Sequence, residues 1–153
     1  MFDELIIFTA KYLFVAVPIL ALVYWIRAPY ATRRYLLLLG ILAGAAALGI
    51  GRLIAYFYFD PRPFVAGHFI PLIAHEPDNG FPSDHTLLSS AIAASVTVCS
   101  RSVGLGLWAI TGLVGIARIL SGLHSPIDVI GSICIASGSA YLVHSLLRRR
   151  FAR

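Results

Sequence analysis

Three polar side chains in the last third of the sequence, Arg118, His124 and Asp128, have types and spacing suited to phosphate chemistry. An arginine offers several N–H donors in one plane, which fits the oxygens of a phosphate. Residues i and i+4 lie one helical turn apart, so Asp128 can hold the Nδ1–H of His124 and leave Nε2 free as a nucleophile. Their neighbours are mostly apolar, and ionisable groups are costly in such surroundings unless they serve a function.

Two further polar clusters interrupt the apolar sequence, Asp60-Pro61-Arg62-Pro63 and Phe81-Pro82-Ser83-Asp84-His85. Arg62 adds a second guanidinium, and a helix that starts at Ser83 offers free N–H groups and a positive dipole end to a phosphate. Histidine can give a proton to a leaving group near neutral pH, so His85 is the candidate general acid. The clusters together predict phosphoryl transfer at an anion site with two histidines.

Helix capping is the plainer explanation for some of these residues. Ser83 follows a proline and precedes an apolar run, as an ordinary N-cap does. The segment Ser125-Pro126-Ile127-Asp128 has the same form, with its acidic residue in the first turn. Capping accounts for Ser83 and Asp128, but it leaves His85 and His124 without a role.

We expect neither a metal nor another cofactor at this site. The sequence contains no His-Glu-x-x-His or Cys-x-x-Cys pattern of the kind that binds zinc. Two arginines beside the histidines would also repel a cation.

The composition is that of an integral membrane protein. Of the 153 residues, 59% are hydrophobic and 12% are charged, whereas soluble proteins average about 25% charged residues. We predict one all-α transmembrane domain, residues 1–153, built as a bundle of about five helices. The five predicted spans cover roughly residues 5–26, 35–59, 83–100, 103–120 and 126–147.

The connections between these spans fall into a basic group and an acidic group. Basic residues fall in the connections after the first and third spans and in the C-terminal tail, which the positive-inside rule assigns to the cytoplasm. Apart from Asp3 and Glu4, the acidic residues lie on or beside loops 60–82 and 122–125. Five spans put these two loops on the opposite face, so we expect the site at the outer interface. The same distribution of arginines argues against nucleic acid as a partner.

The polar clusters resemble the phosphatidic acid phosphatase type 2 superfamily, whose pattern has three parts. The first ends in Arg-Pro, here Arg62-Pro63, and the second is Pro-Ser-Gly-His, here Pro82-Ser83-Asp84-His85. The third is an arginine, a histidine and an aspartate with gaps of five and three residues, here Arg118, His124 and Asp128. The third part is specific, whereas the second alone would be weak.

The resemblance implies a role for each matching residue. His124 would attack phosphorus and form a phosphohistidine, Asp128 would orient it, and His85 would protonate the leaving group. The phosphate oxygens would be held by two arginines, one serine and nearby backbone N–H groups, which here are Arg62, Arg118, Ser83 and the N–H groups near Asp84 and His85.

Two positions depart from the family pattern. The family usually has a lysine where this chain has Ala55, and Arg52 lies three residues earlier on the same helix face as a candidate replacement. Asp84 replaces a glycine and brings a carboxylate near the phosphate, so we expect it to turn away or to hold a neighbouring arginine. We count Arg52 and Asp84 among the candidate phosphate-binding residues.

The Pro-Ser-Asp-His variant and the small size resemble the bacterial undecaprenyl pyrophosphate phosphatases of this superfamily. That resemblance implies hydrolysis of a polyprenyl diphosphate at the outer face of the bacterial inner membrane. Two alternatives stay open. One is a phosphatase for another lipid phosphate, such as phosphatidylglycerophosphate or phosphatidate. The other is a non-catalytic lipid-binding or transport protein.

Overall fold

The computed structural model describes residues 1–151, with side chains to residue 149, and these residues form helices and loops without a named strand. Residues 152–153, the end of the predicted domain and its basic tail, lie outside the described residues. The helical elements are α1 (Phe2–Tyr12), η1 (Leu13–Val15), α2 (Ala16–Arg27), α3 (Tyr30–Phe57), α4 (Pro63–Ala66), α5 (Asp84–Cys99), α6 (Arg101–Leu120) and α7 (Pro126–Phe151). The predicted all-α class is confirmed.

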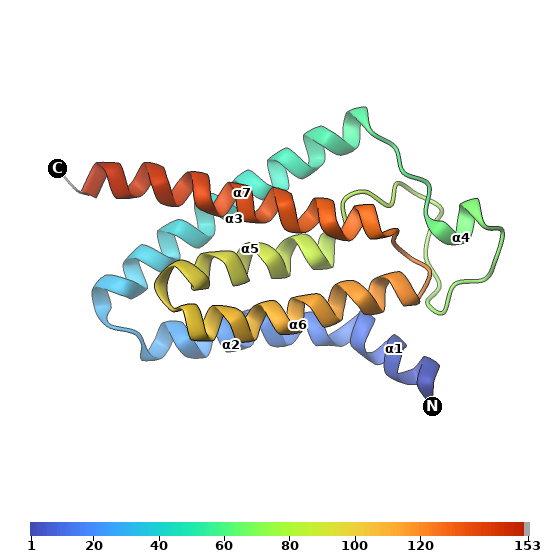
Figure 1. The fold of residues 1–153 in the computed structure, drawn as a ribbon, viewed down its shortest axis with the longest axis horizontal. Helices are drawn as coiled ribbons and strands as arrows, with labels where there is room; N and C mark the ends of the chain where they lie inside the picture. The colour runs from blue at the N-terminus through green and yellow to red at the C-terminus, as the bar shows by residue number, and fades with distance from the viewer. Residues whose placement is uncertain (152–153) are drawn as a thin grey trace.

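Five helical passes run side by side along the long axis of the molecule (Figure 1). The first pass consists of α1, η1 and α2, and the others are α3, α5, α6 and α7. Four segments are long and apolar enough to cross a membrane: Phe2–Arg27, Tyr30–Phe57, Arg101–Leu120 and Pro126–Arg149. The chain is therefore a multi-pass membrane protein, as its composition predicts.

The remaining pass, α5, is short. Its 16 residues would span about 24 Å, less than the ~30 Å apolar layer of a bilayer. It packs against α2, α3, α6 and α7, so its neighbours shield much of it from lipid. This position also explains its buried hydroxyl side chains, which are Thr86, Ser89, Ser90 and Ser95.

The first pass is interrupted at Leu13–Val15, where the sequence pattern predicted one continuous span. Pro18 provides the physical reason. It has no N–H to bond the carbonyl of Phe14, four residues earlier, and its ring crowds that carbonyl. The chain tightens into a short 3₁₀ turn there before it continues as α2.

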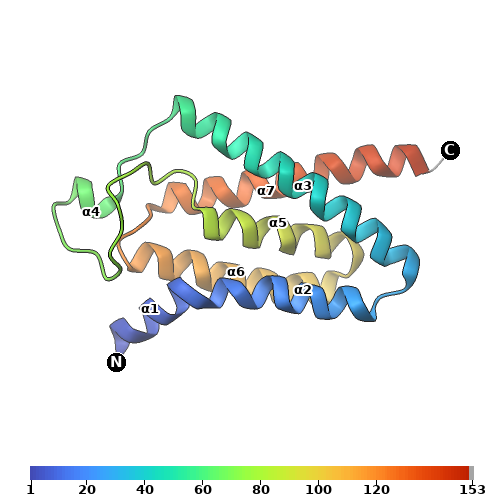
Figure 2. The same cartoon turned by 180° about the vertical axis from the view of Figure 1, so that it is seen from behind.

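The connections between the helices lie at the two opposite ends of the bundle, as Figure 2 shows from behind. One end holds the N-terminus, the long α3–α5 loop and the α6–α7 turn, and we call it the site end. The α2–α3 and α5–α6 turns and the described end of α7 lie at the other end. This arrangement brings the three polar clusters of the sequence to one end of the molecule.

Small residues allow the helices that carry the site to approach closely. A Cβ on Gly115 in α6 would lie 2.7 Å from Cγ1 of Val129 in α7, which is too short for any real contact. Larger side chains at position 115 would therefore push α6 from α7. Because Arg118 is one turn further along α6, this close approach helps to bring it to the start of α7.

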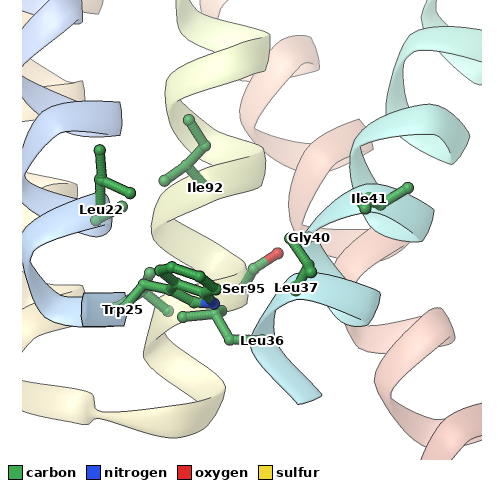
Figure 3. A pocket seen from close by; sticks show the side chains of 10 residues that line it. Leu22, Trp25, Leu36, Leu37, Gly40, Ile41, Ile92 and Ser95 are labelled. Carbon is green, nitrogen blue, oxygen red and sulfur yellow. The ribbon is translucent and has the colours of Figure 1, made fainter. Parts of the chain in front are cut away.

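A separate apolar cavity of about 390 Å³ lies between α2, α3 and α5 (Figure 3). Its walls include Leu22, Trp25, Leu36 and Ile92, and Ser95 contributes its polar hydroxyl. None of the predicted site residues lines it. The polar chemistry of this chain therefore lies outside this cavity, at the site end.

Candidate active site

Five segments at the site end contribute most of the predicted site residues. Arg62 lies directly before α4, the Ser83–His85 cluster begins α5, and Arg118 lies in the last turn of α6. His124 lies in the turn after α6, and Asp128 is in the first turn of α7. Five of these side chains are buried, although each is polar or charged: Arg62, Ser83, Arg118, His124 and Asp128.

Both nitrogens of the His124 ring have partners, and these partners fix its tautomer. Nδ1 lies 2.9 Å from the carbonyl oxygen of Gly80, which can only accept a hydrogen bond. Nε2 lies 3.1 Å from Nη2 of Arg118 and 3.5 Å from Nη1 of Arg62, and guanidinium groups can only donate. The hydrogen is therefore on Nδ1, and the lone pair of Nε2 faces two guanidinium groups.

The surroundings of His124 also favour its neutral form. Burial lowers the pKa of His124 below its ordinary value, and the charges of Arg118 and Arg62 lower it further, while Asp128 raises it. A neutral imidazole keeps the Nε2 lone pair available near neutral pH. The site thus holds a buried histidine in the state that a nucleophile requires.

Asp128 acts both as a helix cap and as a neighbour of His124. Its Oδ2 accepts the N–H of Ser125 at 2.7 Å and lies 3.4 Å from Nδ1 of His124. The spacing of these residues predicted that the carboxylate can hold Nδ1–H. The structure instead places the shorter contact at the carbonyl of Gly80, with the Asp128 carboxylate as a second, longer neighbour.

Arg62 is held by three acceptors besides its contact with His124. Nε donates to Oδ1 of Asp78 at 2.5 Å, and Nη1 donates to the carbonyl of Leu123 at 3.0 Å. Nη2 lies 3.5 Å from the carbonyl of Asn79. The hydrogen bond from Arg62 lowers the pKa of the Asp78 carboxyl below its ordinary value, which keeps the pair ionised. Arg62 is thus fixed in place before any ligand binds.

Arg118 differs from Arg62 because part of its donor capacity is unused. Its side chain is buried, and its Nε has no hydrogen-bond partner among the described residues. A buried donor without an acceptor is costly, by about 1–3 kcal/mol. A phosphate oxygen placed beside Arg118 would remove that cost, so this orphaned donor points to an anionic ligand.

The sequence analysis gave no role to Asn79, which ties the two halves of the long loop together. Its Oδ1 accepts the N–H groups of Asp60 and Phe81, and its Nδ2 donates to the carbonyls of Ala55 and Tyr58. These bonds place the carbonyl of the next residue, Gly80, against His124. The Asn-Gly pair is a recognised turn signal, and it could have pointed to this position.

Three other candidate residues make their contacts away from His124: Ser83, Asp84 and Arg52. Ser83 Oγ is 3.1 Å from Thr86 Oγ1 in the buried first turn of α5. Asp84 Oδ1 lies 3.7 Å from Nη2 of Arg52, and both side chains are mostly exposed. The structure therefore brings Arg52 to Asp84, and among the described residues neither side chain makes a hydrogen bond or ion pair with His124.

His85 lies at the start of α5 and is only partly buried. Its ring packs edge-on against the ring of Phe14 from η1, with 4.4 Å between centroids. Among the described residues its ring nitrogens make no hydrogen bond that meets ordinary geometry. This imidazole is thus positioned by packing, while its nitrogens stay available to exchange a proton.

Residues 35–152 match the family described as the PAP2 superfamily. The chain belongs to this superfamily. A curated relative, the undecaprenyl-diphosphatase BcrC of Bacillus subtilis, is 39% identical over 88% of this chain and 69% of its own length. The bacitracin transport permease protein BcrC of Bacillus licheniformis is 30% identical over 94% of this chain and 70% of its own length.

Two further comparisons extend this result. The putative undecaprenyl-diphosphatase YbjG of Escherichia coli is 30% identical over 85% of this chain and 66% of its own length. The crystal structure of Aquifex aeolicus LpxE superposes with a TM-score of 0.72 at 22% identity, covering 94% of this chain and 86% of the other. The superposition shows a shared fold, and the family match supports a PAP2-type membrane lipid phosphatase.

The membership in the PAP2 superfamily gives the departures from its pattern a structural context. Arg52, the candidate replacement for the missing lysine, pairs with Asp84, the residue in place of the glycine. Asp84 thus holds a neighbouring arginine, which is one of the two arrangements expected from the sequence. The two unusual residues of this PAP2 chain compensate each other's charge at the surface of the site end.

The arrangement of acidic and histidine side chains bears on metal binding. Among the described residues, no three His, Cys, Asp or Glu side chains gather closely enough to hold a metal ion. The groups that face Nε2 of His124 are guanidinium donors instead. This donor set suits an anion.

Proposed function

We propose that this chain hydrolyses undecaprenyl diphosphate to undecaprenyl phosphate and inorganic phosphate through a phosphohistidine on His124. The observation that carries the proposal is the neutral His124 ring, whose Nε2 lone pair faces the guanidinium groups of Arg62 and Arg118. Two relatives named as undecaprenyl-diphosphatases support the choice of substrate. The other proposed phosphate-binding residues are Ser83, Asp84 and Arg52.

In the first step, the terminal phosphate binds the guanidinium groups of Arg62 and Arg118, which then no longer contact Nε2 of His124. Nε2 of His124 attacks the terminal phosphorus, and the bond from that phosphorus to the bridging oxygen breaks. His85 gives its proton to the departing lipid phosphate. The positive charge that forms on the His124 ring is stabilised by Asp128 and by the carbonyl of Gly80.

In the second step, water attacks the phosphorus of the phosphohistidine. His85, now neutral, takes a proton from that water, as microscopic reversibility requires. The bond between phosphorus and Nε2 breaks, and inorganic phosphate leaves. Arg62 and Arg118 stabilise the charge on the equatorial oxygens in both steps. His124 returns to the Nδ1–H tautomer, and His85 carries a proton again.

We also infer on which side of the membrane the site lies and that turnover requires no cofactor. The arginine-lined site supplies positive charge without a metal, so turnover needs no metal or other cofactor. We propose that the site end lies at the outer face of the bacterial inner membrane, and the basic connections at the opposite end of the bundle support this orientation. Residues 1–153 act as one domain, and no nucleic acid takes part.

A substrate panel with purified protein in detergent tests this function. Phosphate release is compared for undecaprenyl diphosphate, phosphatidylglycerophosphate and phosphatidate, with and without EDTA, for the wild type and His124→Ala. We expect kcat/KM to be highest for the diphosphate, unchanged by EDTA and lost in the variant. A preference for a glycerolipid phosphate would overturn the substrate assignment, and loss of turnover in EDTA would overturn the metal-free mechanism.

A transport function is the second candidate because one relative is named as a bacitracin transport permease. Under this alternative, bacitracin resistance conferred by the chain in cells would survive the His124→Ala substitution. The hydrolytic proposal expects resistance and phosphate release to disappear together in that variant. Asp3→Asn, at the exposed N-terminus, is the matched control, and it should retain both properties.

A further inference from the structure

Asp60 is an acidic residue at the site end to which the proposed mechanism gives no role, and unlike Glu76 it is partly buried. It lies two residues before Arg62, between α3 and α4, and is partly buried. Its Oδ2 accepts the hydroxyl hydrogen of Ser125 at 2.9 Å, although the two residues are far apart in sequence. Ser125 directly follows His124, so this bond connects the segment of Arg62 to the segment of the proposed nucleophile.

The main chain of Asp60 makes a second connection to the same place. Its carbonyl accepts the N–H of Gly80 at 2.8 Å, and its own N–H donates to Oδ1 of Asn79. The carbonyl of Gly80 in turn accepts Nδ1–H of His124. Asp60 therefore reaches His124 by two routes, through Gly80 on one side and Ser125 on the other.

The two routes close into a ring through Asp128. Its Oδ2 accepts the N–H of Ser125 at 2.7 Å and lies 3.4 Å from Nδ1 of His124, while its own N–H lies 3.4 Å from Ser125 Oγ. A Cβ at Gly80 would lie only 3.0 Å from Oδ2 of Asp128 and 3.2 Å from the Asp60 carbonyl. The ring is thus packed so closely that only a glycine fits at position 80 without a shift.

We propose that Asp60 is a positioning residue for His124, which it holds in the Nδ1–H tautomer by fixing Ser125 and Gly80 on either side of the ring. This inference rests on the proposed role of His124 as the nucleophile. Without the Asp60 carboxylate, Ser125 Oγ loses its acceptor, and the turn that carries His124 is free to move relative to Arg62. A misplacement of the order of 1 Å at a reacting group costs about 10²-fold in rate.

The charges around Asp60 agree with such a shared arrangement. Burial raises the pKa of the Asp60 carboxyl above its ordinary value, and the nearby Asp128 carboxylate raises it further, while the hydrogen bond from Ser125 lowers it. Two neighbouring carboxylates are tolerated only where donors hold both of them. Ser125 does this, because its hydroxyl serves Asp60 and its N–H serves Asp128.

Four variants test the inference by their kinetics. We expect Asp60→Ala and Ser125→Ala each to lower kcat by about 10- to 100-fold with little change in KM. Because both remove the same bond, the double variant should be no worse than the poorer single one. Asp60→Asn keeps an acceptor oxygen for the Ser125 hydroxyl, so it should recover most of the activity. Glu76→Gln, an exposed change in the same loop, is the matched control and should match the wild type.

A spectroscopic measurement separates this inference from the proposed function, because it does not depend on turnover. Nitrogen-15 NMR of histidine-labelled protein in detergent, with His124 assigned through His124→Ala, reports the tautomer directly. We expect the Nδ1–H tautomer in the wild type and in Asp60→Asn, and a mixture in Asp60→Ala and Ser125→Ala. An unchanged tautomer and unchanged kcat in the folded Ser125→Ala protein would overturn the role of Asp60. If the wild type hydrolyses none of the lipids but the tautomers behave as stated, the proposed function fails and the positioning role stands.

Discussion

His85 and His124 lie at corresponding points of the fold, close to the starts of two neighbouring helices at the site end, but their surroundings differ. His124 is buried, and both of its ring nitrogens have partners. His85 is partly buried and packs against the ring of Phe14. The same side chain is thus fixed in one tautomer by hydrogen bonds at the first position and positioned by ring packing at the second.

This difference shows how two chemical roles arise from one residue type. A nucleophile needs a permanent lone pair in a fixed direction, which the acceptor at Nδ1 and the guanidinium donors at Nε2 provide for His124. A general acid must give up and regain a proton in every cycle, so tight hydrogen bonds to its nitrogens would hinder it. The difference in the bonding of the two rings is what the two roles implied by the family resemblance would require.

The largest expected effect comes from a change of leaving group, which distinguishes the roles of the two histidines. With a lipid diphosphate, we expect kcat/KM to fall by about 10⁴- to 10⁶-fold in His124→Ala and by about 10²- to 10⁴-fold in His85→Asn. An aryl phosphate with an acidic phenol needs no proton on departure. With that substrate, the loss in single-turnover formation of the phosphoryl enzyme should shrink in His85→Asn and stay complete in His124→Ala.

Stopped-flow release of the phenol measures this first step. Circular dichroism and detergent gel filtration of each variant would control for loss of the fold. An equal loss for both substrates in His85→Asn would contradict the assignment of His85 as the acid.

The pH dependence of the activity tests whether His124 differs from His85 as described. His124 must be neutral to attack, and its pKa lies below the ordinary value of 6.5 because it is buried beside two guanidinium groups. Activity that depends on His124 is therefore retained as pH falls to 6.5 and is lost at a lower pH, where the ring takes up a proton. In Asp128→Asn the carboxylate no longer raises this pKa, so the acid limb should move to still lower pH, with a lower maximum rate.

The measurement is kcat/KM against pH for two substrates whose own phosphate groups titrate differently. A limb that stays fixed between the substrates belongs to the enzyme. A common acid limb above pH 6.5 would contradict the neutral, buried state of His124.

The smallest expected effect concerns the packing of His85. Phe14→Leu removes the aromatic edge contact, which is worth about 0.5–1.5 kcal/mol, but keeps an apolar side chain of similar size. We expect a loss of less than about 10-fold in kcat for the lipid substrate, because the ring is positioned less well. Tyr12→Leu, on an exposed aromatic residue of α1, is the matched control. A Phe14→Leu loss as large as that of His85→Asn would mean that Phe14 does more than position the ring.

The sequence predicts those parts of the site that depend on local spacing. His124 and Asp128 are one helical turn apart, and Arg118 is separated from them by a tight turn, so their proximity follows from short-range geometry. The convergence of Arg62 on the same place could also be predicted, because two spans lie between the two loops and so bring both loops to one face. The long, apolar passes were equally predictable from composition.

The remaining features depend on contacts between distant segments. The carbonyl of Gly80 is the shorter acceptor for Nδ1 of His124, and a backbone carbonyl carries no sequence pattern of its own. Its position depends on Asn79, which clamps two parts of a loop whose path no local rule determines. The interruption of the first pass is different, because Pro18 was a visible signal for it.

Trapping the phosphoryl enzyme tests the central claim most directly. His85→Asn is mixed with an aryl phosphate labelled in its phosphoryl group, since formation of the intermediate should proceed while its hydrolysis lacks the general base. After rapid denaturation, we predict one phosphoryl group per chain, labile in acid and stable in alkali, on His124. Label on another residue, or label that survives in the His85→Asn, His124→Ala double variant, would contradict the account.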